Sequence, residues 1–206
     1  NVLKAYEIPT AVSYPLNKKD KVYKREIIDR VGLPCFVKAN RSGSSFGVTK
    51  VHKIENLQAA INTAFEQDDE LIIEAFLEGT EVTVGVLNYK GKVIVLPITE
   101  IISENDFFDY EAKYLGKSDE ITPALISEVQ EKNVREMAKS IYEILNMKGF
   151  SRSEFIFKGD VPYFIEMNTV PGLTKESIFP KQAACAGISL SELFTNAIEM
   201  VVAKND

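Results

Sequence analysis

The chain is poor in the residues on which several classes of protein depend. It has one histidine, His52, and two cysteines, Cys35 and Cys185, in 206 residues. A single histidine excludes histidine-based catalytic triads and zinc clusters, and we assign His52 no function. Two distant cysteines in apolar or small-residue surroundings do not make a disulfide-rich scaffold, so we expect two reduced core thiols in a cytoplasmic protein.

Long hydrophobic runs and clusters of basic residues are also missing. No apolar run approaches the ~20 residues that a membrane-spanning helix needs. The formal net charge is -6 and no basic run interrupts the mixed charges, so neither nucleic acid nor a membrane surface is an expected partner. No signal peptide is visible, and the chain opens without an initiator methionine, so we expect a piece of a longer gene product.

The hydrophobic pattern that is present predicts mixed helices and strands. Apolar residues at helical spacing predict helices over residues 20–31, 56–66, 125–145, 178–186 and 189–203. Short apolar runs predict buried strands over residues 35–39 and 71–73. Period-two alternation predicts hairpins over residues 80–98 and 149–168.

Hairpins, rather than repeated strand–helix–strand crossovers, connect these strands, which predicts an α+β fold. We expect two lobes, a small one over residues 1–81 and a larger one over residues 82–206. Residues 103–122 have no sustained period and are predicted to form a long ordered loop, which is more often functional than idle.

The second hairpin carries a signal for metal chemistry. Side chains two residues apart share a face of a strand, so Arg152 lies beside Glu154, and Glu166 beside Asn168. A turn over residues 159–161 sets Glu154 opposite Glu166, and opposed carboxylates destabilise a sheet unless a cation such as Mg2+ lies between them. The alternative is the solvated face of an ordinary hairpin, and a two-residue turn would favour it by separating the glutamates.

A glycine- and serine-rich loop at residues 41–47 is a candidate phosphate site. Its glycines let backbone N–H groups turn toward phosphate oxygens, and Ser44 and Ser45 add hydroxyl donors. Lys38, at the end of the preceding strand, reaches the same phosphates. The residue order is not that of a Walker loop, and a plain connecting loop is the alternative.

A third candidate follows the strand at residues 71–73. Glu74 lies at the strand exit, where free backbone N–H and C=O groups can read the edge of an adenine base. Glu81 is placed to bind ribose hydroxyls. A charged turn explains the same residues equally well.

Five motifs follow one another in an order that resembles the D-alanine–D-alanine ligases of the ATP-grasp type. They are Gly32-Leu33-Pro34-x-x-Val37-Lys38, Ser42-Gly43-Ser44-Ser45-x-Gly47-Val48, Glu74-x-x-Leu77-x-Gly79-x-Glu81, Asp109-Tyr110-Glu111-Ala112-Lys113-Tyr114 and Glu166-Met167-Asn168-Thr169-x-Pro171-Gly172-Leu173-Thr174. The resemblance runs to about Leu193, nearly the whole chain. It implies an ATP-grasp fold of two lobes with the nucleotide site between them.

The resemblance implies contacts with ATP and a metal ion. The expected ATP contacts are Lys38 and Lys113 on the phosphates, the backbone of Ser44 and Ser45 above them, Glu74, Ala75 and Leu77 around the adenine, and Glu81 on the ribose. The expected ligands of Mg2+, or of Mn2+, are Glu154, Glu166 and Asn168.

The same resemblance implies residues for the chemical steps. Arg152 and the Gly172 N–H would steady a tetrahedral intermediate. Ser177 would bind the carboxylate of the second amino acid. Tyr114 would belong to a loop at residues 110–114 that closes over the site and keeps water out.

The implied reaction phosphorylates one D-alanine to an acylphosphate, which the amine of a second D-alanine attacks, giving D-alanyl-D-alanine for peptidoglycan precursors. Two departures from the family stand out. Glu154 replaces the usual aspartate, and the N-terminal lobe, on which the full-length homodimer depends, has no counterpart here. Two alternatives stay open, an ATP-grasp ligase with another acceptor and a nucleotide-binding module without turnover.

Overall fold

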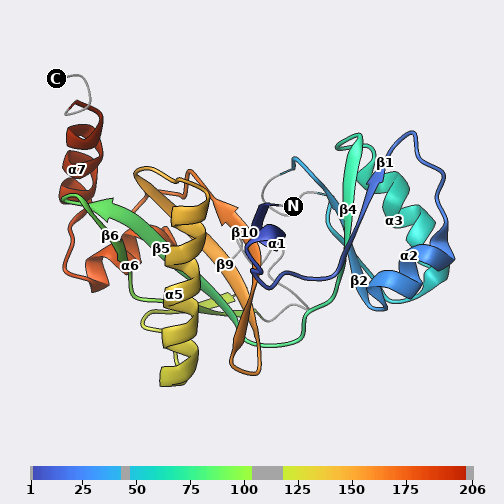
Figure 1. Ribbon diagram of the computed structural model, residues 1–206, viewed down its shortest axis with the longest axis horizontal. Coiled ribbons are helices and arrows are strands. Elements are labelled where there is room, and N and C mark those ends of the chain that lie inside the picture. Colours follow the sequence, from blue (N-terminus) through green and yellow to red (C-terminus); the bar gives the residue numbers. More distant parts are fainter. Residues whose placement is uncertain (1, 43–46, 104–117, 203–206) are drawn as a thin grey trace. The chain divides into compact units, whose positions relative to one another are not determined.

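The computed structural model of the chain describes residues 2–42, 47–103 and 118–202. Two compact units make up the described part (Figure 1). The first unit holds residues 2–10, 78–102 and 119–202, and the second is built on Ala11–Leu77.

The second unit is an antiparallel sheet of four strands with two helices. The strand order is β1 (Ser13–Asn17), β4 (Glu70–Ala75), β2 (Cys35–Ala39) and β3 (Thr49–Val51). The helices are α2 (Lys24–Val31) and α3 (Leu57–Ala64), with a short 3-10 turn, η1 (Ile54–Asn56), before α3.

Alternation along β2 decides which face of this sheet the helices cover. Cys35 and Val37 are fully buried and pack with Ile27 of α2 and Ile61 of α3. Successive side chains of a strand point to opposite faces, so Lys38 lies on the other face, where it is only half-buried. Both helices of the unit therefore lie on one face of the sheet, and Lys38 lies on the other.

The first unit is built on a sheet of six strands. Its order is β10 (Val161–Asn168), β9 (Phe150–Lys158), β5 (Glu81–Tyr89), β7 (Thr99–Ser103) and β8 (Ser118–Ile121), and β6 (Lys92–Val95) pairs with β5. The helices of this unit are α1 (Val2–Ala5), α5 (Glu128–Ile144), α6 (Ile178–Cys185) and α7 (Leu190–Val202).

Strand β5 separates two hydrophobic clusters in this unit. Val84 and Val86 pack with side chains of α5, such as Ala138, whereas Leu87 packs with Phe179 of α6. Helix α5 runs across β10, β9, β5 and β6 (Figure 1). Because neighbouring residues of a strand point to opposite faces, α5 covers one face of the sheet and α6 the other.

Caps set the starts of the two long helices. Ser127 and Gln130 form a reciprocal capping box, with both bonds at 3.1 Å, so α5 begins at Glu128, three residues later than its periodicity predicts. The cap predicted at Ser189 is confirmed, because its Oγ accepts from the Glu192 N–H at 3.2 Å.

Most predicted elements are confirmed, but the structure also contains α1, β1, β3, β7 and β8, which were not predicted. Residues 118–121, predicted as loop, form β8, and residues 104–117 of that predicted loop lie outside the described residues. The helix predicted from residue 20 begins at Lys24. Strand β1 contains Pro15, which a strand tolerates at a sheet edge, and β1 is an edge strand.

The two units differ from the predicted lobes at residues 1–10 and 78–81. The N-terminal segment joins the larger unit because Thr10 forms a parallel bridge with Phe164, and the Phe164 N–H donates to Pro9 O at 2.8 Å. Thr80 joins it because its carbonyl accepts from the Phe157 N–H at 2.9 Å. These contacts are remote in sequence, so local periodicity carries no sign of them.

Both cysteines are free thiols, but only one lies in the core. Cys35 is fully buried, and this burial raises the pKa of its thiol. Cys185 is exposed at the end of α6, so the prediction of two core thiols is wrong for this residue.

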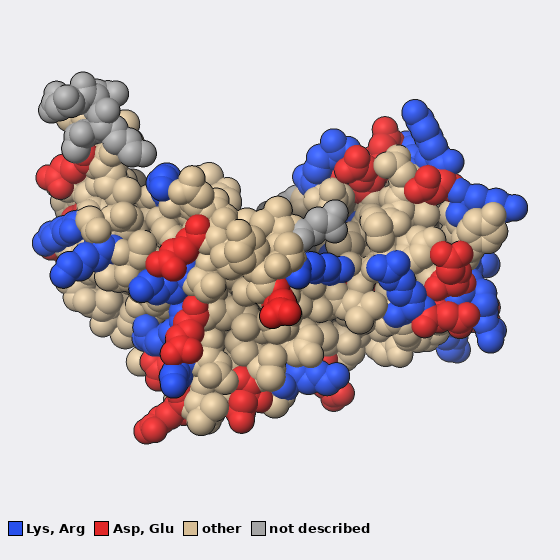
Figure 2. Space-filling model, in the orientation of Figure 1, with Lys and Arg blue, Asp and Glu red and all other residues tan. Residues whose placement is uncertain are grey.

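Acidic and basic side chains both occur on the surface. On the face drawn in Figure 2 they are interspersed, without a broad area of one sign. Among the described helices, no single one is long and apolar enough to cross a membrane, and only α6 and α7 taken together, bent by 100°, match the length and composition of a span.

Gly79 lies just before β5 and packs against Phe157 of β9, so a substitution at this position tests that packing. A Cβ at this position would lie 1.7 Å from the Phe157 carbonyl oxygen, which is part of the backbone and cannot move aside. We expect Gly79→Ala to lower the free energy of unfolding by about 3 kcal/mol, measured by urea denaturation. Gly91→Ala is the control. Gly91 faces open space, so alanine there should lower the free energy of unfolding only by the ~1 kcal/mol of a left-handed backbone conformation. Equal losses would contradict the steric explanation.

Candidate functional site

The β9–β10 hairpin places the two predicted metal-binding glutamates opposite each other, by a route that differs from the prediction. Val161 pairs with Lys158, so the turn has two residues and not three. A β-bulge between Phe164 and Glu166 then shifts the register by one residue, so that Glu166 pairs with Glu154. The opposition is therefore confirmed and the three-residue turn is wrong.

Arg152 partly compensates the two opposed carboxylates. Its Nη2 lies 2.8 Å from Glu154 Oε1, and the Glu154 residue is only 4% exposed. Glu166 is exposed at the surface. Two carboxylates opposite each other on paired strands suit a cation between them.

Asn168 completes the candidate ligand set. It pairs with Arg152 in the register, and its Oδ1 accepts from the Val170 N–H at 3.1 Å, which fixes the amide and leaves a second lone pair on the oxygen. Two carboxylates and an amide oxygen are hard donors of the kind that Mg2+ binds. No group of three or more His, Cys, Asp or Glu side chains able to hold a metal occurs in the described ranges.

The connection from β10 to α6 gathers the predicted substrate-binding groups. A Cβ on Gly172 would lie 2.7 Å from Ser177 Oγ, so the two residues are in close contact. Thr174 Oγ1 lies 2.9 Å from Ser177 Oγ, and Ser177 immediately precedes α6. Hydroxyls, a glycine backbone and a helix N-terminus in one place suit a carboxylate or an oxyanion.

In the second unit the resemblance assigns Lys38 to phosphate and Glu74 to adenine. In the structure their side chains form an ion pair. Lys38 Nζ lies 2.7 Å from Glu74 Oε2, with the side chains 25% and 17% exposed. The rings of Phe36 and Phe76 are 6.0 Å apart, and Lys50 Nζ lies 4.1 Å above the Phe76 ring. This face of the sheet combines aromatic rings with cations, as a base and its phosphates require.

Sequence reasoning missed Phe36, Lys50 and Phe76. A signal for Phe36 was available, because it stands two residues before Lys38 in a strand and shares its face. Lys50 had no such signal, since only the pairing of β3 with β2 places it opposite Phe36.

The expectation of free backbone donors after β4 is partly wrong. The Ala75 N–H donates to Val12 O at 2.8 Å, and the Phe76 N–H donates to Pro34 O at 3.2 Å. The next residue, Leu77, is half-buried, and Glu81 is the first residue of β5 in the other unit.

Four predicted site residues lie outside the described residues: Ser44, Ser45, Lys113 and Tyr114. The residues that flank the glycine-rich loop are nevertheless anchored. The Arg41 N–H donates to Asp68 Oδ2 at 2.8 Å, and Arg41 Nη2 lies 2.8 Å from Asp68 Oδ1. Gly47 lies against Gln67, whose Cγ would be 3.0 Å from a Cβ on this glycine. The Gln67–Asp68 turn therefore contacts both flanks.

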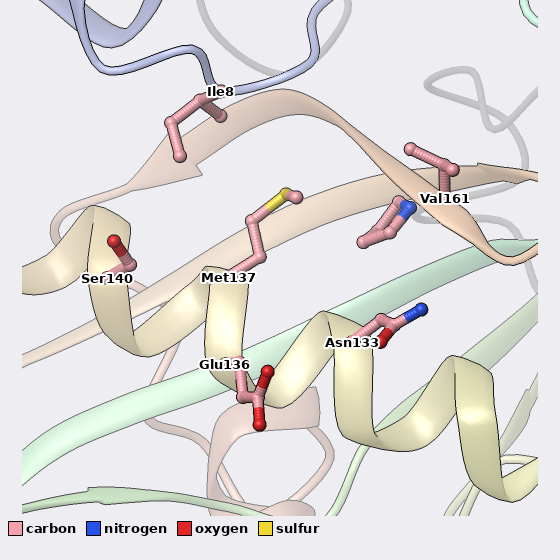
Figure 3. A pocket seen from close by; sticks show the side chains of 7 residues that line it. Ile8, Asn133, Glu136, Met137, Ser140 and Val161 are labelled. Atoms are coloured by element: carbon pink, nitrogen blue, oxygen red, sulfur yellow. The ribbon is translucent and has the colours of Figure 1, made fainter.

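A pocket of about 390 Å³ lies elsewhere in the first unit (Figure 3). Its lining comes from α5, the N-terminal segment and the start of β10: Ile8, Asn133, Glu136, Met137, Ser140, Val161 and Pro162. None of the predicted site residues lines it, and its mostly apolar walls offer little for catalysis.

Comparison with known proteins agrees with this geometry. The family model described as "D-ala D-ala ligase C-terminus" matches residues 2–199. The chain belongs to the D-alanine–D-alanine ligase family.

Two curated members of this ligase family are close in sequence. The D-alanine–D-alanine ligase of Flavobacterium johnsoniae is 62% identical over 203 residues, which are 98% of this chain and 63% of the relative. That of Christiangramia forsetii is 61% identical over 199 residues, 97% of this chain and 61% of the relative. The chain thus spans less than two thirds of the length of these ligases.

Solved structures show that the family's ATP-grasp fold is present here. The D-alanine–D-alanine ligase of Bacillus anthracis complexed with ATP superposes with a TM-score of 0.83 at 29% identity, covering 99% of this chain and 65% of that one. The VanG D-Ala:D-Ser ligase of Enterococcus faecalis also gives 0.83, at 34% identity, covering 96% and 58%.

The Arg41–Asp68 ion pair beside the glycine-rich loop leads us to predict how the stability of this chain depends on pH. The hydrogen bond from the Arg41 side chain, with help from backbone N–H groups, lowers the pKa of Asp68 to about 2 from 3.8. The ionised form is thus favoured on folding, so its stabilisation is full above about pH 4 and is lost as the pH falls through about 2.

We therefore expect Asp68→Asn to lower the free energy of unfolding at neutral pH, with the difference from wild type shrinking toward about pH 2. Urea denaturation across this range measures it. Asp69→Asn is the matched control, because Asp69 pairs with Lys18 at the surface, where both side chains are more than half exposed. A difference for Asp68→Asn that does not change with pH would refute the assignment.

Proposed function

We propose that the whole protein joins two D-alanine molecules with ATP and Mg2+ through an acylphosphate, to supply D-alanyl-D-alanine for peptidoglycan. The observation that carries the proposal is the row of Arg152, Glu154, Glu166 and Asn168 on paired strands, followed along the chain by the loop that brings Gly172 and Ser177 together. A metal-binding edge beside a carboxylate-binding loop is what activation of one amino acid and attack by another require.

The Lys38 face is assigned to the nucleotide. Lys38 would neutralise the phosphates, with Ser44, Ser45 and Lys113 as further contacts. Glu74, Ala75 and Leu77 would border the adenine, and Glu81 would take the ribose. The Lys38–Glu74 pair supports this, because Glu74 holds the lysine ammonium in place before ATP arrives and so reduces the ordering cost of binding.

The β9–β10 hairpin and the loop before α6 are assigned to the chemistry. Glu154, Glu166 and Asn168 would hold Mg2+, which stabilises charge on the transferred phosphoryl group when it is bound. Arg152 and the Gly172 N–H would stabilise the oxyanion that forms when the second amine attacks. Ser177 would orient the acceptor carboxylate, and Tyr114 would help to exclude water from the acylphosphate.

The acceptor has a specific rival. The VanG relative is named a D-Ala:D-Ser ligase, so the same fold serves D-serine as well as D-alanine in this family. Identity of 62% to a D-alanine–D-alanine ligase favours D-alanine here. We further propose that the full-length protein is a cytoplasmic homodimer.

The first test is ADP release from Mg-ATP with D-alanine, D-serine, D-lactate, L-alanine or no acceptor. We expect release that depends on D-alanine from a form extended at the N-terminus. Lys38→Ala should lower kcat/KM for ATP by at least about tenfold, since a charge-assisted contact is lost. Lys53→Ala, which removes an exposed lysine to which no role is assigned, is the control. Preference for D-serine would change the acceptor, and release without any acceptor would contradict ligation.

The metal assignment can be tested without turnover. We expect Glu166→Gln to raise the Kd of Mn2+ in the presence of ADP by about tenfold or more, measured by the EPR signal of free Mn2+. Glu143→Gln on α5 removes one negative charge away from the hairpin and should leave the Kd unchanged. Equal Mn2+ binding by wild type and Glu166→Gln would place the metal elsewhere.

A further inference from the structure

Gln182 is a polar residue in an apolar part of the core. It lies on α6, is completely buried, and has Leu96 and Phe179 as neighbours beside Gly85. Burying an amide is unfavourable unless its donors and acceptors are satisfied. A buried glutamine in this position therefore points to a function in its hydrogen bonds.

The amide nitrogen of Gln182 has two partners on the sheet. Nε2 donates to Thr83 O on β5 at 2.8 Å and lies 3.0 Å from Thr99 Oγ1 on β7. Because a carbonyl oxygen can only accept, the Thr83 contact fixes which end of the amide is the nitrogen. Thr99 Oγ1 is held in turn by Thr122 Oγ1 at 2.6 Å.

The amide oxygen of Gln182 is therefore also fixed in direction. It lies against β5 at Gly85, where a Cβ would approach it to 2.6 Å. Within the described part of the chain, this buried oxygen has no hydrogen-bond partner. Glycine is needed at position 85 because the amide oxygen occupies the space that any side chain would fill.

Gly85 stands in the same row as Arg152. The two residues pair across β5 and β9, and Arg152 pairs with Asn168 across β9 and β10. Directly opposed residues of antiparallel strands share a face, so the Arg152 side chain rises next to the Gly85 position. Arg152 Nε is buried and also has no partner among the described residues, whereas Nη2 bonds to Glu154.

Gln182 Oε1, a buried acceptor, and Arg152 Nε–H, a buried donor, thus both lie beside Gly85, and neither has a partner among the described residues. We propose that Gln182 is a positioning residue for Arg152, its Oε1 accepting the Nε–H of Arg152 through one bridging water. The guanidinium is then held at two points, by Glu154 at Nη2 and by Gln182 at Nε.

Holding Arg152 at two points aims its remaining N–H groups. Arginine presents its donors in a rigid planar fork, so fixing one edge of the guanidinium fixes the direction of the other. The effect of this positioning on turnover, which rests on the proposed function, is to direct these donors at the oxyanion of the acyl transfer. Gln182 itself touches no substrate and acts through Arg152.

The contact is tested directly on the 206-residue chain by NMR of the arginine Nε–H signals. Gln182→Met keeps the length of the side chain and removes the acceptor. We expect the Arg152 Nε proton to exchange with water about fivefold faster in this variant, because a protecting hydrogen bond is lost. Arg135 is the internal control, since its Nε donates to Glu131 Oε1 at 2.8 Å on α5, away from the change.

An unchanged Arg152 exchange rate, with Arg135 also unchanged, overturns the proposal. If Gln182→Met unfolds the chain, so that Arg135 loses its protection as well, Gln182→Glu decides. A carboxyl keeps the acceptor oxygen, so wild-type exchange at Arg152 supports the proposal and faster exchange refutes it.

Turnover provides the second arm, with the N-terminally extended form. We expect Gln182→Met to lower kcat about tenfold while KM for ATP stays within about twofold, because only the oxyanion contact is displaced. A rise in KM for ATP with unchanged kcat would contradict a role through Arg152. Absence of ligase activity in wild type would overturn the proposed function, and the NMR result would then judge the Gln182–Arg152 contact alone.

Discussion

The opposition of Glu154 and Glu166 is the constraint from which the rest of the site follows. Like charges across two strands are unfavourable, so the pair needs cations, and Arg152 supplies one of them at 2.8 Å from Glu154. The bulge between Phe164 and Glu166 creates this arrangement, because the two-residue turn alone would leave the glutamates on different faces. A single extra residue in one strand thus converts an ordinary hairpin into a candidate metal site.

The sheet of the second unit divides its polar and apolar side chains between its two faces. Its helices cover one face, where Val37 and Ile73 are fully buried, and the polar side chains of the same strands gather on the other. Lys38 and Glu74 meet there across β2 and β4 and neutralise each other, so neither charge is left unpaired at a half-buried position. The pairing makes a cation available to phosphate without a large desolvation cost.

Much of the site was predictable because its residues stand close together in the sequence. The motif from Glu166 to Thr174 and the spacing of Arg152 and Glu154 indicated both the candidate metal ligands and the candidate substrate loop. Phe36 shares the face of Lys38 by simple alternation, and could have been included. Gln182 could not, since only the packing of α6 on β5 and β7 brings its amide to Thr83 and Thr99. The β-bulge in β10 could not be predicted either, because no residue type at 164–166 requires it.

The sequence by itself determined the α+β class, most of the helices and strands, and the family, because periodicity, caps and local motifs are short-range properties. The tertiary structure decided the register of β9 on β10, the membership of residues 2–10 in the larger unit, and the partners of Lys38 and Gln182. Each of these depends on contacts between residues far apart in the chain, such as Thr10 with Phe164 or Lys38 with Glu74. Such contacts form only when whole elements pack together, and a local pattern carries no record of which remote residue will lie opposite.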